Sequence, residues 1–363
     1  MSNQAGAGGG GREGSATVAF LRQVPLFAGL TADELHDLVA GMQPIELAPG
    51  ELLWRQGQAA DALHVISEGR IGIYLRQPGG TEVRLTTLGP REVLGEVPLI
   101  DGGTRSATAR VLDRARLWSL SRVDFAALTL RRSPTALALR RRICAVACTR
   151  LRDRYQQLAN SLPPGLPSGA SEPPTAAELT ESAPSDDYLT NLAFFRDFAA
   201  DHLRSLVERS QLFMIPRRRV LEHEGDAPRG CYVTLNGAVE ITIERGRQRI
   251  PIGLAGPGQA FSYVGLIDGK TAPVTVRTRE LSLLLRIAPD PFAGYFHGAT
   301  AKSHALFNAI ERDLMGALRR TDLGFVRAVG TAAIRTSAMA PERGAPFDQG
   351  DTGPLPSTGP PGG

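Results

Sequence analysis

The sequence contains one pattern twice, and this duplication constrains the fold more than any other feature. An offset of 168 residues places Gly57 against Gly225, and after a one-residue deletion the offset becomes 167. Residues 99–102 then match residues 266–269, because both segments read Leu-Ile-Asp-Gly. Other matched pairs are Leu35 with Leu203, Val65 with Val233, Gly69 with Gly237, and Thr108 with Thr275. Two copies are too few for a solenoid, so the repeat predicts a duplicated domain.

Low-complexity stretches set the expected domain boundaries. Residues 1–17 are rich in Gly, Ala and Ser and are predicted to be disordered, whereas the Pro-, Ser- and acid-rich residues 161–187 are predicted to form a linker. The Pro- and Gly-rich residues 329–363 are expected to be a disordered tail. Two ordered domains remain, at 18–160 and 188–328.

Each ordered block begins with a short amphipathic helix, predicted at 30–41 and 198–209. Thr31 and Glu34 have the spacing of a capping box, which favours a helix start at this point. Each block ends in a pattern typical of a long helix, because apolar residues recur every three or four positions. These residues are Ile143, Ala147, Leu151, Tyr155 and Leu158 in the first block, and Leu306, Ile310, Leu314 and Leu318 in the second.

Between the helices, short apolar runs alternate with turn signals and predict strands at 62–67, 71–75, 230–235 and 239–243. Asn236-Gly237 lies between two of these runs and indicates a hairpin. Each block is therefore expected to hold a many-stranded antiparallel sheet that closes on itself.

Composition excludes several classes of protein. The net charge of +4 is small for 363 residues, and no dense basic patch of the kind that binds nucleic acid is present. The sequence has no signal peptide and no run of 18 apolar residues, so no membrane contact is expected. Three cysteines are too few for a disulfide framework and favour a reducing cytoplasm.

The segment 95–108 carries the candidate site. Gly95 and Glu96 open a short helical turn, whose free backbone N–H groups attract an anion. Arg105 supplies a planar guanidinium that can bind two phosphate oxygens at once. Because the Glu96 carboxylate would not favour a phosphate alone, a ligand with both a phosphate and a nearby hydroxyl explains the pair. The alternative interpretation is a structural ion pair between Glu96 and Arg105.

The segment resembles the phosphate-binding cassette of the cyclic nucleotide-binding domain, G-E-x-x-L-x-x-x-x-x-R-[AST]-A-[TS], and matches it at every key position. This family includes catabolite activator proteins, kinase regulatory subunits and gated channels. The resemblance implies that Glu96 binds the ribose 2′-hydroxyl and Arg105 the cyclic phosphate. Gly95, Val97 and Ser106 would line the same pocket.

The resemblance covers both blocks and implies a mainly β fold with flanking α-helices. The expected architecture is two tandem eight-stranded β-rolls, which are jelly-roll-like, each followed by a long C-terminal helix. Pro98 departs from the family pattern, since it offers no backbone N–H to the phosphate. One missing hydrogen bond would weaken binding by about 1 kcal/mol.

The second copy of the cassette has lost its polar residues. Tyr263 replaces the glutamate and Ala272 replaces the arginine. Loss of a charged partner for phosphate costs about 1.5–3 kcal/mol. We therefore expect this copy not to bind a cyclic nucleotide in the family manner, and we expect Lys270 to be a surface lysine rather than a phosphate ligand.

Other candidate groups have less specific patterns. Cys144 and Cys148 lie four residues apart, but no further ligand joins them, so we expect a helix seam rather than a metal site. No histidine lies in a catalytic pattern. The basic residues near them suggest a solvated helix face. These are Arg140, Arg141, Arg142, Arg150, Arg152 and Arg154. The resemblance implies that this helix pairs with its twin in a dimer, and it makes Thr149 and Arg150 weak candidates for contacts to the base.

Two hypotheses from different classes remain. The first is a cytoplasmic, non-catalytic sensor that binds cyclic AMP, or else cyclic GMP, in its first domain and signals through an unidentified protein partner or a change of assembly. The second is a ligand-free scaffold that dimerises through its long helices. A DNA-binding regulator is disfavoured, because the residues after Leu318 are too few and too rich in Pro and Gly for a helix-turn-helix. No kinase-inhibitor segment precedes the first domain.

Overall fold

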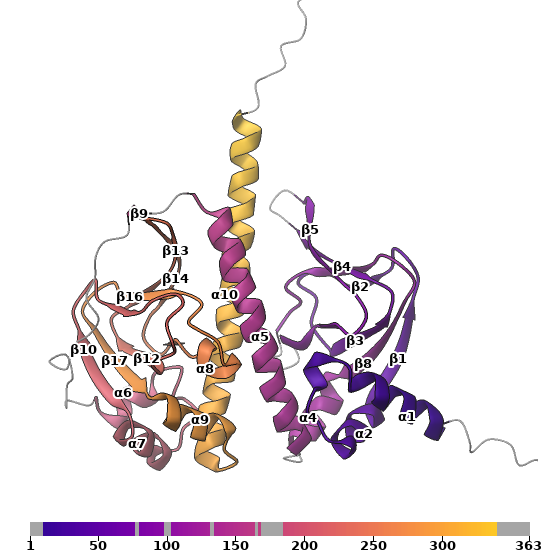
Figure 1. Cartoon of the computed structure of the whole chain (residues 1–363), viewed down its shortest axis with the longest axis horizontal. Helices are drawn as coiled ribbons and strands as arrows, with labels where there is room; N and C mark the ends of the chain where they lie inside the picture. The colour runs from indigo at the N-terminus through magenta and orange to yellow at the C-terminus, as the bar shows by residue number, and fades with distance from the viewer. Residues whose placement is uncertain are drawn as a thin grey trace, which may run out of the picture.

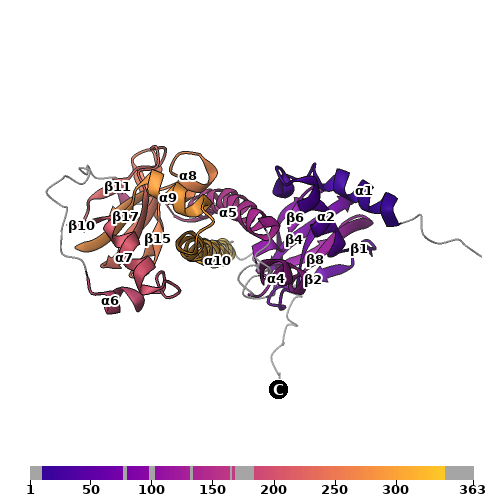
Figure 2. The same ribbon diagram turned by 90° about the horizontal axis from the view of Figure 1, so that it is seen from below.

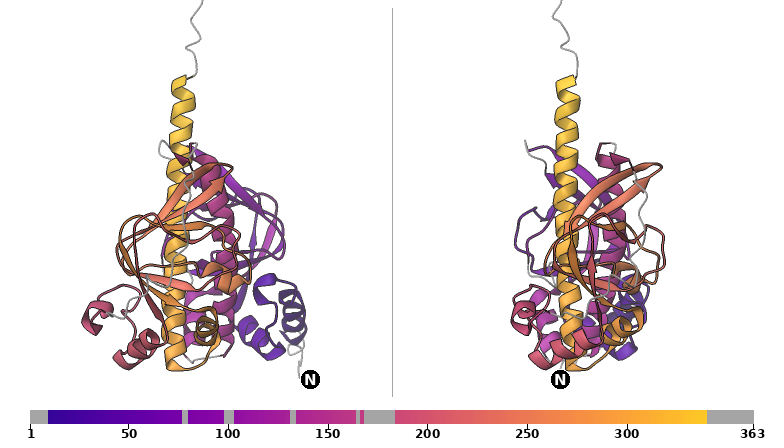
Figure 3. Two further views of the ribbon diagram at one scale, coloured as in Figure 1. Left: turned by 60° about the vertical axis from the view of Figure 1, so that its left-hand side comes forward. Right: turned by 90° about the vertical axis from the view of Figure 1, so that its left-hand side faces the viewer.

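Two β domains lie on either side of a central pair of long helices, α5 (Pro134–Ser161) and α10 (Ala301–Met339), in a computed structural model of the chain (Figure 1). Figure 2 shows the same pair between the domains from below, and Figure 3 shows that α10 extends past the strands of both. The structure describes residues 10–76, 80–97, 103–130, 134–163, 166–167 and 184–339.

The first domain contains two antiparallel sheets of four strands each within the described residues. Their strand orders are β1-β8-β3-β6 and β2-β7-β4-β5. The strands are β1 (Met42–Leu47), β2 (Leu52–Trp54), β3 (Ala62–Glu68), β4 (Ile71–Arg76), β5 (Glu82–Leu88), β6 (Val93–Leu94), β7 (Thr108–Val111) and β8 (Ala115–Ser121).

The second domain repeats this topology, with strand orders β10-β17-β12-β15 and β11-β16-β13-β14-β9. The extra strand β9 (Leu166–Pro167) comes from the segment between the domains and pairs with β14. The other strands are β10 (Gln211–Ile215), β11 (Val220–Glu222), β12 (Cys231–Asn236), β13 (Val239–Arg245), β14 (Gln248–Ala255), β15 (Ala260–Phe261), β16 (Thr275–Thr278) and β17 (Ser282–Ile287).

Shorter helices cover the ends of the rolls. The first capping box is present as predicted, because Thr31 Oγ1 accepts from the Glu34 backbone N–H at 3.2 Å and Glu34 Oε2 accepts from the Thr31 N–H at 2.8 Å. These helices are α1 (Gly10–Leu21), η1 (Pro25–Phe27), α2 (Ala32–Ala40), α4 (Arg122–Leu130), α6 (Asp186–Thr190), α7 (Ala200–Glu208), α8 (Val264–Asp268) and α9 (Pro289–His297).

The predicted fold class is confirmed, but two local predictions about the sheets are wrong. The described strands of each domain form two separate sheets and not one sheet that closes on itself. Asn236-Gly237 does not make a hairpin, since β12 pairs with β15 and β17 whereas β13 pairs with β14 and β16. The turn instead carries the chain from one sheet to the other. Gly69 makes the same crossing in the first domain, and both glycines have positive φ, 81° and 82°.

Regular structure also extends into segments that composition alone suggests are loose. Helix α1 begins at Gly10, within the predicted disordered segment 1–17, because the apolar Val18 and Leu21 bury one side of it in the core. Helix α10 continues to Met339, past the expected boundary at 328. Residues 1–9 and 340–363 lie outside the described part of the chain.

The long-helix patterns of both blocks meet in one core. Leu151 of α5 and Leu314 of α10 are both buried, and α5 packs along α10 between the domains. Cys144 and Cys148 are free thiols buried in this core, as the seam interpretation predicted, and burial raises the pKa of both. None of the described helices is long and apolar enough to cross a membrane.

Of the six basic residues predicted to form a solvated face on α5, five are partly buried and Arg142 is exposed, so the prediction of a solvated face is wrong for all but Arg142. Arg152 forms two hydrogen bonds with Asp268 of the second domain, at 2.6 and 2.9 Å. Arg140 pairs with Glu311 of α10, whose side chain is 5% exposed. The second domain and α10 cover this side of α5, and their acidic groups compensate its charge. Dimerisation through the long helices stays a prediction.

Candidate functional site

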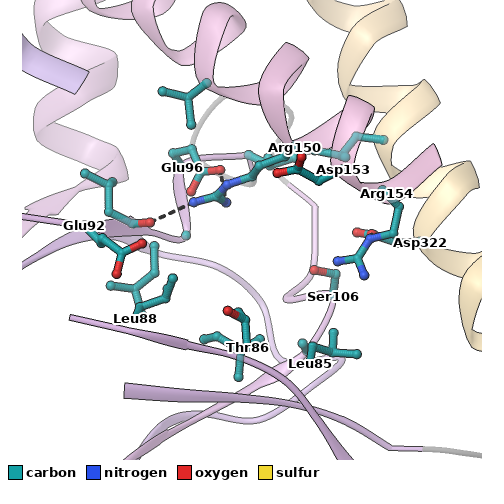
Figure 4. Close-up of a pocket in the computed structure, with 18 of the residues that line it drawn as sticks. Leu85, Thr86, Leu88, Glu92, Glu96, Ser106, Arg150, Asp153, Arg154 and Asp322 are labelled. Carbon is teal, nitrogen blue, oxygen red and sulfur yellow. Dashed lines mark hydrogen bonds and ion pairs between the residues drawn. The ribbon is translucent and has the colours of Figure 1, made fainter. Parts of the chain in front are cut away.

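A cavity of about 590 Å³ opens between the first roll, α5 and α10. All five residues predicted to bind the ligand lie in its wall: Gly95, Glu96, Val97, Arg105 and Ser106. The cavity volume is within the range of small-molecule sites. Residues 98–102, which include the departing Pro98, lie outside the described part of the chain. Figure 4 shows Glu96 and Arg150 below α5, with Leu85, Thr86 and Leu88 across the cavity from them.

Arg105 is held by an aromatic ring on one side and by acceptors on its edge. Its guanidinium carbon lies 3.8 Å from the centroid of the Trp54 ring, a cation–π contact. Nη2 donates to the carbonyl of Ala62 at 2.8 Å and to Asp61 Oδ1 at 3.2 Å. Trp54 is itself fixed, because its Nε1 donates to the Ala107 carbonyl at 2.9 Å. The orientation of the guanidinium therefore depends on Trp54 and Asp61, which the sequence analysis did not identify.

Gly95 is required by this arrangement for two reasons. Its φ is +80°, a conformation that side-chain-bearing residues rarely adopt. A Cβ at this position would lie 2.1 Å from Nη1 of Arg105 and 3.0 Å from the carbonyl oxygen of Ala62. The cassette glycine thus permits the close approach of the arginine.

Glu96 lies at the start of the short helical turn and is fully buried. Arg150 of α5 forms an ion pair with its Oε1, and donates a second hydrogen bond to the Val93 carbonyl at 2.8 Å. Its other oxygen, Oε2, has no hydrogen-bond partner in the described structure, and neither has Nε of Arg105. Buried polar atoms are nearly always paired in proteins. Two residues of the cavity wall, Glu96 and Arg105, therefore each have a buried polar atom without a hydrogen-bond partner.

Burial dominates the electrostatics of the site. It lowers the pKa of Arg105, and the negative charges of Asp61 and Glu96 only oppose this effect. His64, which stacks on Trp54 with ring centroids 5.5 Å apart, has its pKa lowered to about 4 by burial and by Arg105. His64 is thus neutral at pH 7, and the guanidinium supplies the positive charge beside it. An anionic ligand would compensate that charge.

Helix α10 closes the cavity from the other domain. Leu318, Arg319, Asp322 and Phe325 line it. Asp322 pairs with Arg154 of α5 at 2.7 Å (Figure 4). The Arg154 guanidinium also lies 5.1 Å from the centroid of the Phe325 ring. The two residues named as weak candidates for base contacts, Thr149 and Arg150, both line the cavity, and Arg150 is also paired with Glu96. Sequence reasoning missed the α10 residues, because they come from the other copy of the repeat.

Comparison with protein families assigns the two rolls. Residues 44–132 and 212–297 match the cyclic nucleotide-binding domain family. The chain carries two cyclic nucleotide-binding domains. The described residues contain no group of three or more His, Cys, Asp or Glu side chains that could hold a metal ion.

Curated relatives with this domain have several functions. The cyclic AMP receptor protein of Thermus thermophilus is 33% identical over 134 residues, which are 37% of this chain and 60% of the relative. A CRP-like cAMP-activated global transcriptional regulator of Mycobacterium tuberculosis is 29% identical over 28% of this chain and 46% of its own length. The cAMP-dependent protein kinase type II regulatory subunit of Drosophila melanogaster is 23% identical over 71% of this chain and 55% of the relative. This chain thus spans about half the length of the curated relatives it matches.

Two solved structures are also similar to this chain. The regulatory domain of Toxoplasma gondii PKA with cAMP has 17% sequence identity and a TM-score of 0.31, covering 90% of this chain and 97% of that one. The N-terminal domain of a transcriptional regulator from Streptomyces coelicolor A3(2) has 35% identity and a TM-score of 0.32, covering 34% and 89%.

The second cyclic nucleotide-binding domain has different groups at the same positions. Ala272 occupies the position of Arg105, and Glu222, which is 1% exposed, occupies the position of Trp54. Tyr263 replaces Glu96, and its hydroxyl donates to Asp313 of α10 at 2.8 Å. Burial raises the pKa of Glu222 to about 7, against a smaller effect of the Ser262 hydroxyl. A buried carboxyl group thus occupies the place of the aromatic support for the phosphate-binding arginine.

Proposed function

We propose that this chain is a cytoplasmic regulatory protein that binds one cyclic nucleotide, cyclic AMP, in its first domain and performs no covalent chemistry. The observation that carries the proposal is the pair of unpaired buried atoms in one cavity, Nε of Arg105 and Oε2 of Glu96. A cyclic nucleotide presents an anionic phosphate and a ribose hydroxyl in one rigid molecule, and the two would complete this pair. The free cysteines agree with a reducing compartment.

In this proposal the phosphate binds Arg105, whose stacking on Trp54 fixes the plane of the guanidinium before the ligand arrives. Pre-orientation reduces the entropy lost on binding. The Glu96 carboxylate accepts from the ribose hydroxyl. Both unpaired atoms are shielded from solvent, so the side chains of Glu96 and Arg105 have to move before the ligand can reach them.

The contacts of the cassette provide a route for the signal. Arg150 connects Glu96 to α5, and the pair of Arg154 with Asp322 connects α5 to α10. A ligand hydroxyl that competes for Glu96 changes the first contact, so the position of α5 responds to occupancy. We propose that the output is a protein partner or a change of assembly that senses this helix pair.

Isothermal titration of the full chain with cyclic AMP tests the proposal. We expect heat from one site per chain, and at least a 100-fold loss of affinity in Arg105→Ala, because a desolvated charge-assisted contact is removed. Arg116→Ala is the matched control, since Arg116 lies on β8 at the surface and pairs weakly with Glu46 at 3.7 Å. Equal affinity in Arg105→Ala and Arg116→Ala would refute the phosphate contact.

The choice of purine rests on the relatives alone, whose names specify cyclic AMP. Competition between cyclic AMP and cyclic GMP for the same site measures it. If cyclic GMP binds more tightly, the assigned binding site would stand, but the proposed ligand would be cyclic GMP instead of cyclic AMP.

Transcription regulation is a second candidate function, because the similar Mycobacterium tuberculosis protein is a CRP-like cAMP-activated global transcriptional regulator. A gel-shift assay with genomic DNA fragments, with and without cyclic AMP, separates the candidates. Retardation that depends on cyclic AMP would favour the second.

A further inference from the structure

A second cavity, of about 170 Å³, lies in the other domain between its roll, α5 and α10. Helices α5 and α10 separate it from the first cavity. Leu151 and Tyr155 of α5 line the second cavity, whereas their neighbours Arg150 and Arg154 line the first.

The second cavity is the counterpart of the first, and not an accidental gap. At the offset of 167, ten roll residues of its wall match ten residues in the wall of the first cavity. The pairs are Leu85 with Ile252, Thr86 with Gly253, Leu88 with Ala255, Val93 with Ala260, Leu94 with Phe261, Gly95 with Ser262, Glu96 with Tyr263, Val97 with Val264, Ser106 with Pro273, and Ala107 with Val274. The duplicated domain has thus kept an internal cavity at this place while it lost the phosphate-binding residues.

The replacements remove the charged cassette residues from the wall of this cavity. Ser106 becomes Pro273, Glu96 becomes Tyr263, and the apolar residues Ile241, Ile252 and Val276 also line it. Among the polar groups that remain, the buried Ser262 hydroxyl has no hydrogen-bond partner in the described structure, whereas two other hydroxyl groups are engaged. The Tyr263 hydroxyl donates to Asp313 at 2.8 Å, and the Thr321 hydroxyl donates to the Ala317 carbonyl at 2.8 Å.

A charged ligand is disfavoured here. With Ala272 in place of the arginine, an anion would lose its main partner, and the buried Glu222 lies where Trp54 supports that arginine in the first domain. A cation would lie in the same cavity as the positive charge of Arg320, which is part of its wall on α10. Apolar side chains and the rings of Tyr155, Phe261 and Tyr263 favour a neutral aromatic molecule instead.

We propose that the second cavity is a binding site for a compact, neutral, monocyclic aromatic molecule. Its volume sets the size of the ligand, because an apolar cavity of about 150 Å³ in a protein stays dry and binds benzene. A molecule of this kind gains dispersion contacts with the apolar side chains of the wall and has no polar group that must be desolvated. The site is distinct from the one proposed for the cyclic nucleotide and does not depend on it.

Thermal unfolding of the full chain with saturating toluene tests the site. We expect the midpoint to rise by about 1–3 °C, since a ligand of the native state stabilises it. Ala317→Leu places a larger side chain in the cavity from α10 and should abolish the rise. Ala328→Leu, on the same helix outside both cavities, should retain it, and so should Arg105→Ala.

A second variant covers the case in which Ala317→Leu does not fold. Ile252→Ala enlarges the cavity from β14, so indole, which is larger than toluene, should raise the midpoint of this variant at least twofold more than that of the wild type. No shift with toluene in the wild type would overturn the proposal. A toluene shift that persists in folded Ala317→Leu, or that disappears in Arg105→Ala, would also overturn it, because the probe would then lie elsewhere.

Discussion

The two domains share a backbone and differ in their chemistry. The paired glycines Gly57 and Gly225 have φ values of 82° and 91°, and the crossing glycines have nearly equal values. Both domains place an eight-strand roll against the same two helices. The first domain nevertheless has an arginine stacked on a tryptophan in its cavity, whereas the second has an alanine beside a buried acid. The residues at turns and in the core therefore maintain this fold, and the site residues can change without altering it.

The site residues also vary together. Gly95 accommodates Arg105, since a Cβ would lie 2.1 Å from the guanidinium. In the second domain the arginine has become Ala272, and the glycine has become Ser262, which keeps a positive φ of 61°. Once the guanidinium is absent, a side chain fits. Loss of the arginine thus removed the steric reason for the glycine.

The two domains are expected to differ most in how their stability depends on pH. Burial raises the pKa of Glu222 from 4.5 to about 7, so its stabilising contribution is complete below pH 4.5 and is lost as pH rises through 7. Burial lowers the pKa of His64 from 6.5 to about 4, so its contribution is complete above pH 6.5 and is lost as pH falls toward 4. The two domains should therefore respond to pH in opposite directions.

Substitution separates these two contributions. The free energy of unfolding gained by Glu222→Gln should be about 2–3 kcal/mol larger at pH 8 than at pH 5. For His64→Gln the dependence should reverse: the free energy of unfolding of the variant, relative to that of the wild type, should be higher at pH 5 than at pH 8. Urea unfolding at both pH values measures this, and parallel profiles for the two variants would contradict the opposition.

The next effect tests the coupling of glycine and arginine. Gly95→Ala should destabilise the chain by about 2–3 kcal/mol, because a strained φ and a steric clash combine. Ser262→Gly should change stability by less than about 1 kcal/mol. Thermal melts of Gly95→Ala alone and in an Arg105→Ala background form a double-mutant cycle. If the clash with Arg105 causes the destabilisation, Gly95→Ala should destabilise the Arg105→Ala variant less than it destabilises the wild type. An equal loss of stability in both would show that backbone strain at position 95 is the whole cause.

A smaller change in stability is expected from the hydrogen bond between Tyr263 and Asp313, which joins the second roll to α10. Tyr263→Phe should cost about 1–2 kcal/mol, since the buried Asp313 loses the phenol donor and keeps the Ala260 backbone N–H at 3.2 Å. Tyr188→Phe is the control, because its hydroxyl donates to the Leu235 carbonyl nearer the surface. Chemical denaturation compares them, and equal losses would argue against a special role for the Asp313 contact.

The smallest effect tests the contribution of α10 to the first cavity. Phe325→Ala should weaken cyclic AMP binding by about 3- to 10-fold, because part of the apolar wall is removed. Leu323→Ala, at a neighbouring position that is 58% exposed, should leave the affinity unchanged. Titration calorimetry resolves this difference. The same affinity in both variants would restrict the site to the first domain.

Local signals predicted the elements of the fold well. Thr31 and Glu34 fix a helix start through contacts three residues apart, and the spacing of Leu151 and Tyr155 needs only the helix period. The route of the chain between sheets was not predictable from Asn236-Gly237, because the same turn chemistry suits a hairpin and a crossing. Whether the turn makes a hairpin or a crossing depends on the strands that pair with β12 and β13, and several of these strands are distant in the sequence.

For the candidate site, sequence reasoning identified residues that share the cassette but missed those brought to it by tertiary packing. Asp322 and Phe325 lie more than 200 residues from Arg105, and only the packing of α10 against α5 brings them there. Trp54 could have been found, since the offset that defines the repeat matches it with Glu222, an aromatic ring against an acid. Whether the five predicted residues bind a ligand remains a prediction.

Helices α5 and α10 form part of the wall of both cavities, so the two cavities share structural elements. Leu318 and Arg319 belong to one chamber while Ala317 and Arg320, beside them in the chain, belong to the other. A rigid helix cannot rotate or slide to suit an occupant on one side without altering the space on the other. Thermodynamic linkage then requires reciprocity, so that whatever factor an aromatic occupant imposes on nucleotide affinity, the nucleotide must impose on the aromatic.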